Sequence, residues 1–293
     1  MHQRTIRLTC VANAPCHLPD AADEDSPLLS RNAPPALPPP RASAFVRFSG
    51  LAYALIAYLA FNSVLIYCIG FVGNFMVPLS IDAGRSADTV SAMLINVLLL
   101  ALFGVQHSVM ARPGFKGWIT RIVPKPAERS TYVMISSVLL AVVMWQWRPI
   151  PTVLWHVEAN WAQLVIWVLF AGGWLMALAA TFLTDHFEML GVKQALAHFR
   201  GQPCDTAQFH ERALYRWVRH PIMLGQIIAF WAIPTMTAGH LLFATIMLAY
   251  TLIGLHFEER DLVKAHGDAF RDYQKRIPKL VPRLKQAKRP SGN

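Results

Sequence analysis

Long apolar runs separated by short polar segments form the main pattern of this sequence. Four such runs occupy residues 51–77, 90–107, 131–147 and 161–183. Each is close to or longer than the roughly 20 residues that an α-helix needs to cross the hydrocarbon core of a bilayer. The pattern therefore predicts four membrane-spanning helices before residue 184.

A fifth apolar segment, residues 222–257, contains no Lys, Arg, Asp or Glu, but it is interrupted at residues 234–239. Its two halves, residues 221–233 and 241–257, would form helices of about 20 and 25 Å. Both are shorter than a hydrocarbon core about 30 Å thick. We therefore expect a helical hairpin whose nearly equal arms enter and leave on one side of the membrane. The alternative is a single kinked span.

Charged residues lie at both ends of this hairpin. Arg219 and His220 precede it in the run RHPIMLG, and Glu258 and Glu259 follow it in the run EERDL. Arms of similar length would bring the two pairs to one depth, facing each other. Such residues suggest a functional site, because keeping charge near the bilayer is costly. A plain ion-pair cluster, or an Arg219 that reaches the lipid headgroups, is the alternative.

The composition agrees with a membrane protein. Hydrophobic residues make up 54% of the chain and charged residues 15%, and the mean hydropathy is +0.35. We predict an all-α polytopic fold with four spanning helices, the hairpin and a cytoplasmic amphipathic helix over residues 262–273.

Basic residues indicate the orientation of this fold. Of the 27 Lys and Arg residues, 25 lie on alternate segments that share one side of the membrane. The positive-inside rule then places both termini and the hairpin's charged ends in the cytoplasm, with a bacterial inner membrane as the expected location. Topology and contact with anionic lipid account for the net charge of +10, so no nucleic-acid partner is implied. The oligomeric state is not predicted.

Three regions follow from these patterns. Residues 1–47, with PPALPPP and DAADED, predict a disordered leader without a secretory signal. Residues 48–184 hold the four spanning helices, and residues 185–293 hold a cytoplasmic loop, the hairpin and the C-terminal segment. The four cysteines show no close pairing, so we expect neither a disulfide framework nor a metal site.

The start of the hairpin suits an anion. Pro221 is favourable at a first helical position, where its missing N–H costs nothing. The free N–H groups of that first turn, with Arg219 beside them, would attract a carboxylate or a phosphate. Gly225 and Ala229 have the spacing that lets two membrane helices approach closely.

These motifs carry a family resemblance. RHP with a glycine four residues later, then EE, then HG and a spaced Phe and Tyr before a Pro, resembles the C-terminal cofactor region of the isoprenylcysteine carboxyl methyltransferase superfamily. That superfamily includes phospholipid N-methyltransferases and NnrU-like proteins. TDHFEMLGVKQ and LYRWVRHPIMLG resemble the bacterial methanethiol S-methyltransferases, and the similarity covers roughly residues 50–284.

The resemblance implies a cofactor, S-adenosylmethionine, held near the cytoplasmic face. Arg219 and the helix N-terminus would bind its carboxylate, and Glu258 or Glu259 its ammonium group. The cofactor-binding residues implied in this way are Arg219, His220, Pro221, Leu224, Gly225, Glu258, Glu259, His266 and Tyr273. No glycine-rich loop follows a predicted strand, which argues against a soluble Rossmann methyltransferase.

The resemblance also indicates which molecule accepts the methyl group. Prenylcysteine enzymes usually have Tyr two residues after the RHP proline, where this chain has Met223. This difference favours a small thiol, converted from methanethiol to dimethyl sulfide, over a prenylcysteine or a lipid amine. An NnrU-like role in nitrogen-oxide metabolism, an NADPH-dependent reductase, a small-solute transporter and a non-catalytic scaffold are further alternatives.

A thiol must lose its proton to become a good nucleophile. The candidate bases are Asp185, His186 and Glu188 near the end of the fourth apolar run, with His220 next. A polar helix end without chemistry is the alternative for the first three. Gln106 and His107, at the end of the second run, could join the site, but we expect them to form a solvated helix end.

Overall fold

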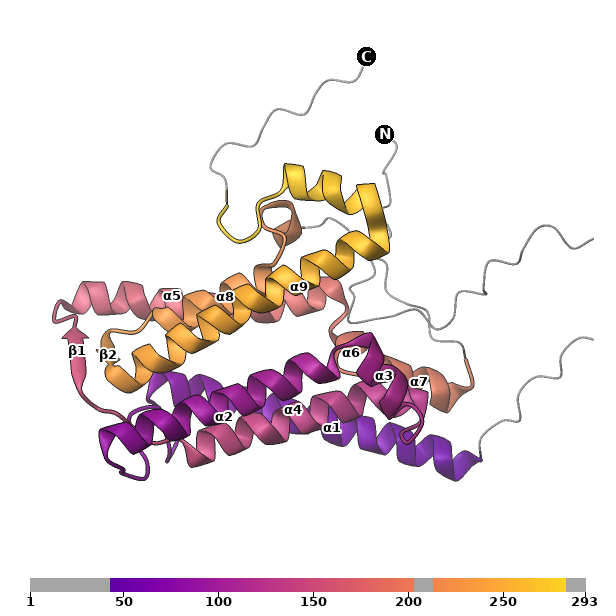
Figure 1. The fold of residues 1–293 in the computed structure, drawn as a ribbon, viewed down its shortest axis with the longest axis horizontal. Helices are drawn as coiled ribbons and strands as arrows, with labels where there is room; N and C mark the ends of the chain where they lie inside the picture. The colour runs from indigo at the N-terminus through magenta and orange to yellow at the C-terminus, as the bar shows by residue number, and fades with distance from the viewer. Residues whose placement is uncertain (1–42, 203–212, 283–293) are drawn as a thin grey trace, which may run out of the picture.

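The computed structural model describes residues 43–202 and 213–282, and this part of the chain is predominantly helical (Figure 1). Five helical segments are long and apolar enough to cross a membrane. They are α1 (Ala44–Gly73), α2 (Thr89–Met110), α4 (Lys125–Gln146), α5 (Asn160–Thr184) and Ala238–Lys264 of α9 (Ala238–Arg276). The predicted all-α polytopic membrane fold is confirmed. The expected leader lies mainly outside the described residues.

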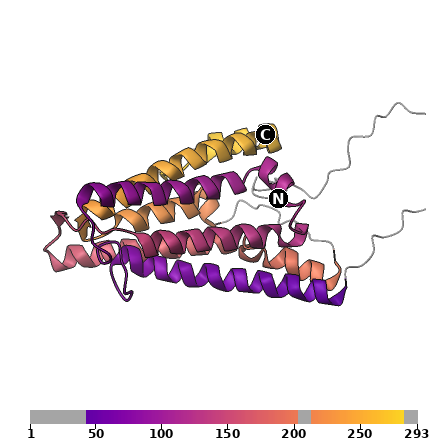
Figure 2. The same cartoon turned by 60° about the horizontal axis from the view of Figure 1, so that its bottom comes forward.

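The spanning helices form two layers. Helices α5, α8 (Pro221–Trp231) and α9 lie above α1, α2 and α4 in Figure 1, and Figure 2 shows the same elements after a turn of 60°. In the upper layer α5 packs mainly on α8, and in the lower layer α1 packs mainly on α4. A core of large apolar side chains joins the layers, including Phe71, Trp147, Trp174, Phe230 and Phe243.

Glycine brings α5 and α8 into close contact. A Cβ built on Gly173 would lie 2.6 Å from the carbonyl oxygen of Gly225, and a Cβ on Gly225 would lie 2.5 Å from that of Gly173. Both distances are too short for a real side chain. The predicted close approach at Gly225 is therefore present, and it serves helix packing.

The predicted hairpin is present, but its two arms differ in length. Helix α8 has 11 residues and is about 16 Å long. Helix α9 runs on past Phe257 through EERDLVKAH to its bend, so the expectation of two short arms is wrong for the second. The charged run continues the helix because Glu, Arg, Leu and Lys are good helix formers. After α8, residues 232–237 contain the short strand β2 (Thr235–Thr237).

Gly267 ends the straight part of α9. Its backbone angles, φ 56° and ψ −129°, are far from helical, and glycine alone adopts them readily. The chain turns back there, so that Leu262, Phe270 and Tyr273 pack together. The predicted amphipathic helix of residues 262–273 is therefore the bent end of α9.

The two ends of the bundle are closed differently. At one end, strands β1 (Val153–His156) and β2 (Thr235–Thr237) form an antiparallel pair. At the other end lie α3 (Pro113–Ile119), α6 (His186–Met189) and α7 (Val192–Arg200) (Figure 1), and the 3₁₀ turn η1 (Ala213–Arg216) precedes α8 in the chain.

Candidate active site

Arg219 and Glu259 form an ion pair beside the N-terminus of α8. The Nη2 atom of Arg219 lies 2.7 Å from Oε1 of Glu259, and Nε donates to the same oxygen at 2.8 Å. The two side chains are only 9% and 10% exposed. The sequence predicted this meeting of RHP and EE, and the structure confirms the contact.

Three further side chains surround this ion pair: His220, Glu258 and Lys279. We call the five residues Arg219, His220, Glu258, Glu259 and Lys279 the Glu259 cluster. His220 Nε2 lies 3.2 Å from Glu259 Oε1, and its Nδ1 lies 3.9 Å from Glu258 Oε2. Lys279 Nζ lies 3.1 Å from Glu259 Oε2. Each glutamate thus has a basic neighbour, although only Glu259 contacts Arg219.

The segment after the bend of α9 folds back onto the Glu259 cluster. Nη1 of Arg219 donates to the carbonyls of Gln274 at 2.9 Å and Ile277 at 2.5 Å. The backbone N–H groups of Arg219 and His220 donate to Pro278 and Lys279. His220 is the N-cap of α8 and Pro221 its first residue, as predicted. Arg219 therefore fastens the C-terminal segment to the start of α8.

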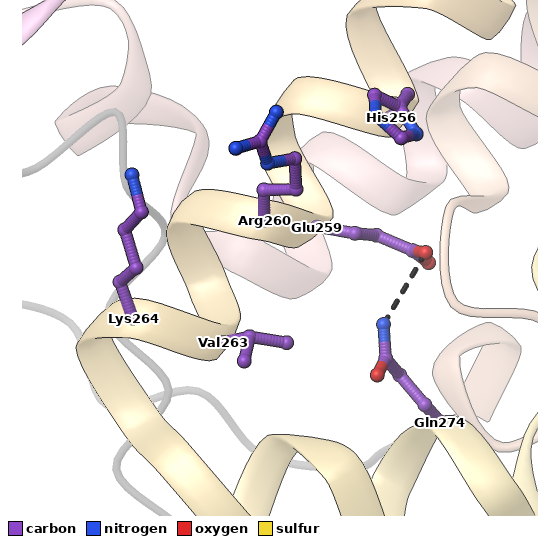
Figure 3. A pocket seen from close by; sticks show the side chains of 6 residues that line it. All are labelled: His256, Glu259, Arg260, Val263, Lys264 and Gln274. Atoms are coloured by element: carbon purple, nitrogen blue, oxygen red, sulfur yellow. Dashed lines mark hydrogen bonds between the residues drawn. The ribbon is translucent and has the colours of Figure 1, made fainter.

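An open pocket of about 350 Å³ lies inside the bend of α9. Figure 3 shows its lining from both sides of the bend, with Glu259 pointing toward Gln274. The Nε2 atom of Gln274 donates to Glu259 Oε2 at 3.3 Å. The lining residues are His256, Glu259, Arg260, Val263, Lys264 and Gln274.

This pocket fits a zwitterionic group such as the methionine end of S-adenosylmethionine. Its wall offers the carboxylate of Glu259 to an ammonium group, and Arg260 and Lys264 to a carboxylate. The volume falls within the usual range of small-molecule sites. The wall thus carries opposite charges, but Glu259 is already paired with Arg219 and Lys279, and the basic lining residues are not the predicted Arg219.

The predicted cofactor residues Pro221, Leu224, Gly225 and Tyr273 are not among the residues that line this pocket. Pro221 and Gly225 are buried on α8, where Gly225 packs on α5, and Leu224 is partly buried on the same helix. Tyr273 is buried and donates to the carbonyl of Tyr215 at 2.8 Å. The side chain of His266 lies outside the described part of the chain.

Three of the predicted catalytic residues form a separate group at α6. Asp185 adopts φ 89° and caps α6 by accepting from the N–H of Glu188 at 3.0 Å. Lys193 Nζ binds Asp185 Oδ2 at 2.6 Å and Glu188 Oε2 at 3.1 Å. Burial lowers the pKa of Lys193, but the two carboxylates outweigh it and raise that pKa. We call Asp185, Glu188 and Lys193 the Lys193 cluster.

His186 is held beside the Lys193 cluster as a buried imidazole. Its Nδ1 lies 2.8 Å from the hydroxyl of Thr181, and its ring stacks on Phe182 with the ring centres 4.3 Å apart. Burial lowers the pKa of His186 below its usual value, against the opposing effect of Asp185. The imidazole is therefore mainly neutral near pH 7.

Tyr215 connects the two regions. Its hydroxyl lies 3.2 Å from that of Thr184, next to Asp185, and its carbonyl accepts from Tyr273. Tyr215 thus contacts both the residue before Asp185, through its side chain, and the predicted cofactor residue Tyr273, through its backbone.

Known proteins resemble most of this chain. The model of the NnrU protein family matches residues 95–285. Methanethiol S-methyltransferase 2 of Bradyrhizobium diazoefficiens is 50% identical over 240 residues, which are 82% of this chain and 92% of the relative. The chain belongs to the NnrU family.

Two further relatives have lower sequence identity to this chain. Methanethiol S-methyltransferase of Mycobacterium tuberculosis is 48% identical over 80% of this chain and 97% of the relative. Nurim of Sus scrofa is 30% identical over 64% of this chain and 70% of the relative. No solved structure matches the chain.

Several residues of this NnrU-family site were not predicted from the sequence. Arg260 follows EE directly and could have been chosen, as could Lys264 one helical turn later. Gln274 and Lys279 reach Glu259 only because Gly267 turns the chain back, which no local pattern indicates. Tyr215 lies in the quoted LYRWVRHPIMLG run, but nothing in that run signals a link to Thr184.

His107 also departs from its expected place. Instead of forming a solvated helix end, its ring stacks on Phe103 with the centres 5.5 Å apart. The hydroxyl of Tyr132 lies 2.9 Å from its Nε2. His107 thus faces the interior of the bundle, between α2 and α4.

Proposed function

We propose that this protein is a membrane-bound methyltransferase that converts methanethiol to dimethyl sulfide, with S-adenosylmethionine as the methyl donor. The names of relatives 41–50% identical over most of the chain support the reaction and the acceptor. The observation that supports the donor is the pocket in the bend of α9, where one carboxylate and two basic side chains line the same opening.

Residues of the Glu259 cluster and of the adjoining pocket wall would together hold the amino-acid end of the donor. Glu259, with Glu258 beside it, would bind the ammonium group through charge-assisted hydrogen bonds. Arg260 and Lys264 would attract the carboxylate, while Arg219 holds Glu259 and the C-terminal segment in position. S-adenosylmethionine, once bound, supplies an activated methyl group. Pro221, Leu224, Gly225, His266 and Tyr273 stay predictions as contacts of this group.

The proton of the acceptor thiol needs a base. Asp185, His186, Glu188 and His220 remain our sequence-based candidates for this role. His220 is adjacent to the Glu259 cluster, whereas the other three lie at α6. A neutral His186 could accept a proton near pH 7, whereas Asp185 and Glu188 are both paired with Lys193.

The orientation in the membrane is part of this proposal. The charged end of the bundle would face the cytoplasm, together with both termini, as the distribution of Lys and Arg indicates. A cytoplasmic donor site would have direct access to S-adenosylmethionine made in the cell.

The reaction is tested with membranes that contain the protein, S-adenosylmethionine and methanethiol. We expect dimethyl sulfide in the headspace, measured by gas chromatography. Arg219→Ala should abolish most of it, whereas Arg271→Ala, which changes an exposed arginine on α9, should not. Absence of dimethyl sulfide from well-expressed wild-type protein would refute the acceptor, and methylation of a lipid amine in its place would assign another one.

A further inference from the structure

A second group of polar side chains lies where the spanning helices α2, α4 and α9 meet. We call it the bundle cluster: Gln106, His107 and Ser108 of α2, Tyr132 of α4 and Tyr250 of α9. Polar side chains inside a membrane bundle are costly and commonly mark a functional site. The donor site proposed above uses none of these residues.

The imidazole of His107 lacks a full set of hydrogen bonds. The Tyr132 hydroxyl lies 3.1 Å from Nδ1 and 2.9 Å from Nε2. The two ring nitrogens point in divergent directions, so a single hydroxyl can align with only one of them. Among the described residues, Tyr132 is the hydrogen-bond partner of both nitrogens. One nitrogen of His107 is therefore left without an aligned partner.

Gln106 adds an unmatched atom next to His107. Its Nε2 donates to the hydroxyl of Ser136 at 3.3 Å. Its Oε1 is buried and has no hydrogen-bond partner within the described part of the chain. Exchanging the two ends of the amide would leave the nitrogen unmatched instead. Such a buried atom is satisfied when a small polar ligand binds.

Tyr250 brings a second hydroxyl to the cluster. Its Oη lies 3.2 Å from Oγ of Ser108, and its ring centre lies 6.4 Å from that of His107. A Cβ on Gly104 would lie 3.1 Å from the Tyr250 ring. Glycine at this position thus lets the tyrosine lie directly against α2.

Helix α9 connects the bundle cluster to the Glu259 cluster. Tyr250 and Glu258 are eight residues, or about 12 Å, apart along this helix. At 3.6 residues per turn, Glu258 lies about 80° around the helix from Tyr250, whereas Glu259 lies on the opposite face. Arg112, just after α2, binds Asp261 of α9 at 3.0 Å. This ion pair holds the ends of the two helices together.

We propose that the bundle cluster binds the acceptor thiol and that His107 takes its proton. The S–H bond breaks, the proton moves to the ring nitrogen of His107 that lacks an aligned partner, and the electron pair stays on sulfur. The hydroxyls of Tyr132 and Tyr250 donate to the thiolate. The imidazolium later returns the proton to water. The inference rests on the proposed function, for which it names the acceptor site, and methanethiol has only two heavy atoms to accommodate.

Thiol binding without a methyl donor tests the proposal apart from turnover. Thiolates absorb in the ultraviolet, whereas thiols do not absorb at the same wavelength. Adding methanethiol to the detergent-solubilised wild-type protein at neutral pH should produce thiolate absorbance, because free alkyl thiol is mostly protonated. His107→Gln should lose this signal, and Tyr132→Phe should weaken it. His156→Gln, at the other end of the bundle, is the matched control and should keep it.

The pH dependence of turnover is a second test of the role of His107. Dimethyl sulfide formation by His107→Gln should fall about 100-fold at neutral pH, the usual scale for losing a general base. It should then recover about tenfold per pH unit, as the solution supplies thiolate. Binding of S-adenosylmethionine should be unchanged. The charged groups around the bundle cluster are Arg129, 5.2 Å from the centre of the Tyr132 ring, Glu128 near Tyr132 and Arg112 near Tyr250, and all three are present in every variant.

Different results separate the two proposals. Thiolate absorbance of wild-type strength in His107→Gln would overturn this inference, as would a loss of activity that no rise in pH restores. If dimethyl sulfide formation recovers at higher pH in His186→Gln or His220→Gln, and not in His107→Gln, the base is the residue changed in that variant. Wild-type protein that forms the thiolate but yields no dimethyl sulfide would refute the proposed function and leave His107 in its role.

Discussion

The two ends of the bundle use polar groups in opposite ways. At the β1–β2 end, Asn96 accepts from the backbone N–H of Arg148 at 2.9 Å and donates to its carbonyl at 2.7 Å. The indole of Trp147 donates to Ile81, and Thr237 donates to Asp82. At the other end, the Glu259 cluster combines three basic and two acidic side chains next to an open pocket.

The difference shows where a ligand can act. Polar groups at the β1–β2 end mostly satisfy backbone atoms of loops, so their contacts hold the chain in place. Side chains of the Glu259 cluster contact one another, although Arg219 also binds the carbonyls of Gln274 and Ile277, and Arg260 and Lys264 lie at the adjoining pocket wall. At the charged end, opposite charges line an opening, the pocket in the bend of α9. We therefore place the donor site at that end.

The largest predicted effect comes from neutralising Glu259. Glu259→Gln keeps a hydrogen-bond acceptor for Arg219 but removes the only acidic group of the pocket wall. We expect dimethyl sulfide formation to fall by about 100-fold or more and S-adenosylmethionine binding, measured by calorimetry, to be lost. Asp82→Asn also replaces a carboxylate by an amide, at the β1–β2 end. It should leave dimethyl sulfide formation and S-adenosylmethionine affinity within about twofold of wild type. Equal losses in the two variants would remove the distinction between the ends.

The next largest effect is expected from a steric clash between α5 and α8, midway between the two ends of the bundle. Gly225→Val places a side chain against the backbone of Gly173, so we expect a stability loss of about 3 kcal/mol or more from overpacking. The melting temperature in detergent measures it. Gly172→Val is the control, because a Cβ there meets nothing within 4 Å. If Gly225→Val melts like wild type, the close contact between α5 and α8 is wrong.

A smaller loss should follow at the β1–β2 end. Asn96→Ala leaves the N–H and the carbonyl of Arg148 without their partner, which costs about 1–3 kcal/mol. We expect a lower melting temperature and an unchanged affinity for S-adenosylmethionine. A variant that loses affinity while keeping its melting temperature would show that this end contributes to binding.

The smallest effect concerns pH. Because burial lowers the pKa of His186 in the folded protein, the unfolded chain takes up the proton first as the pH falls. The stability that the neutral imidazole contributes is complete above the unfolded pKa of about 6.5 and is lost as the pH falls through the lower folded value. Wild type should therefore lose more melting temperature between pH 7.5 and pH 5 than His186→Phe. Equal losses would contradict the buried, neutral His186.

Much of the fold follows from hydrophobic patterning. Four spans and the meeting of Arg219 with Glu259 were predicted because apolar runs of sufficient length define helices and a hairpin fixes its own ends. The length of α9 was misjudged because the apolar run ends at Phe257, whereas helix propensity carries the helix on through the charged residues. Strand pairing of residues 153–156 with 235–237 joins segments far apart in sequence, so no local pattern predicts it.

The site was predicted in part for the same reason. Glu258, Glu259 and Arg219 are visible as charges beside an apolar run. Lys279 and Gln274 join them only through the backbone angles of Gly267, which depend on tertiary packing. Asp185 and Glu188 were chosen as ionisable residues near the end of the fourth apolar run, but their partner Lys193 was not. The pairing of His107 with Tyr132 needs the relative rotation of α2 and α4, which sequence alone does not give.

Photolabelling tests the location of the donor site most directly. The solubilised protein is irradiated with S-adenosylmethionine that carries a radioactive methyl group, and the labelled peptides are mapped by mass spectrometry. Our account predicts label within residues 256–279, lost in Glu259→Gln and kept in Asp82→Asn. Label in residues 185–200, at the Lys193 cluster, would contradict the placement of the donor in the bend of α9.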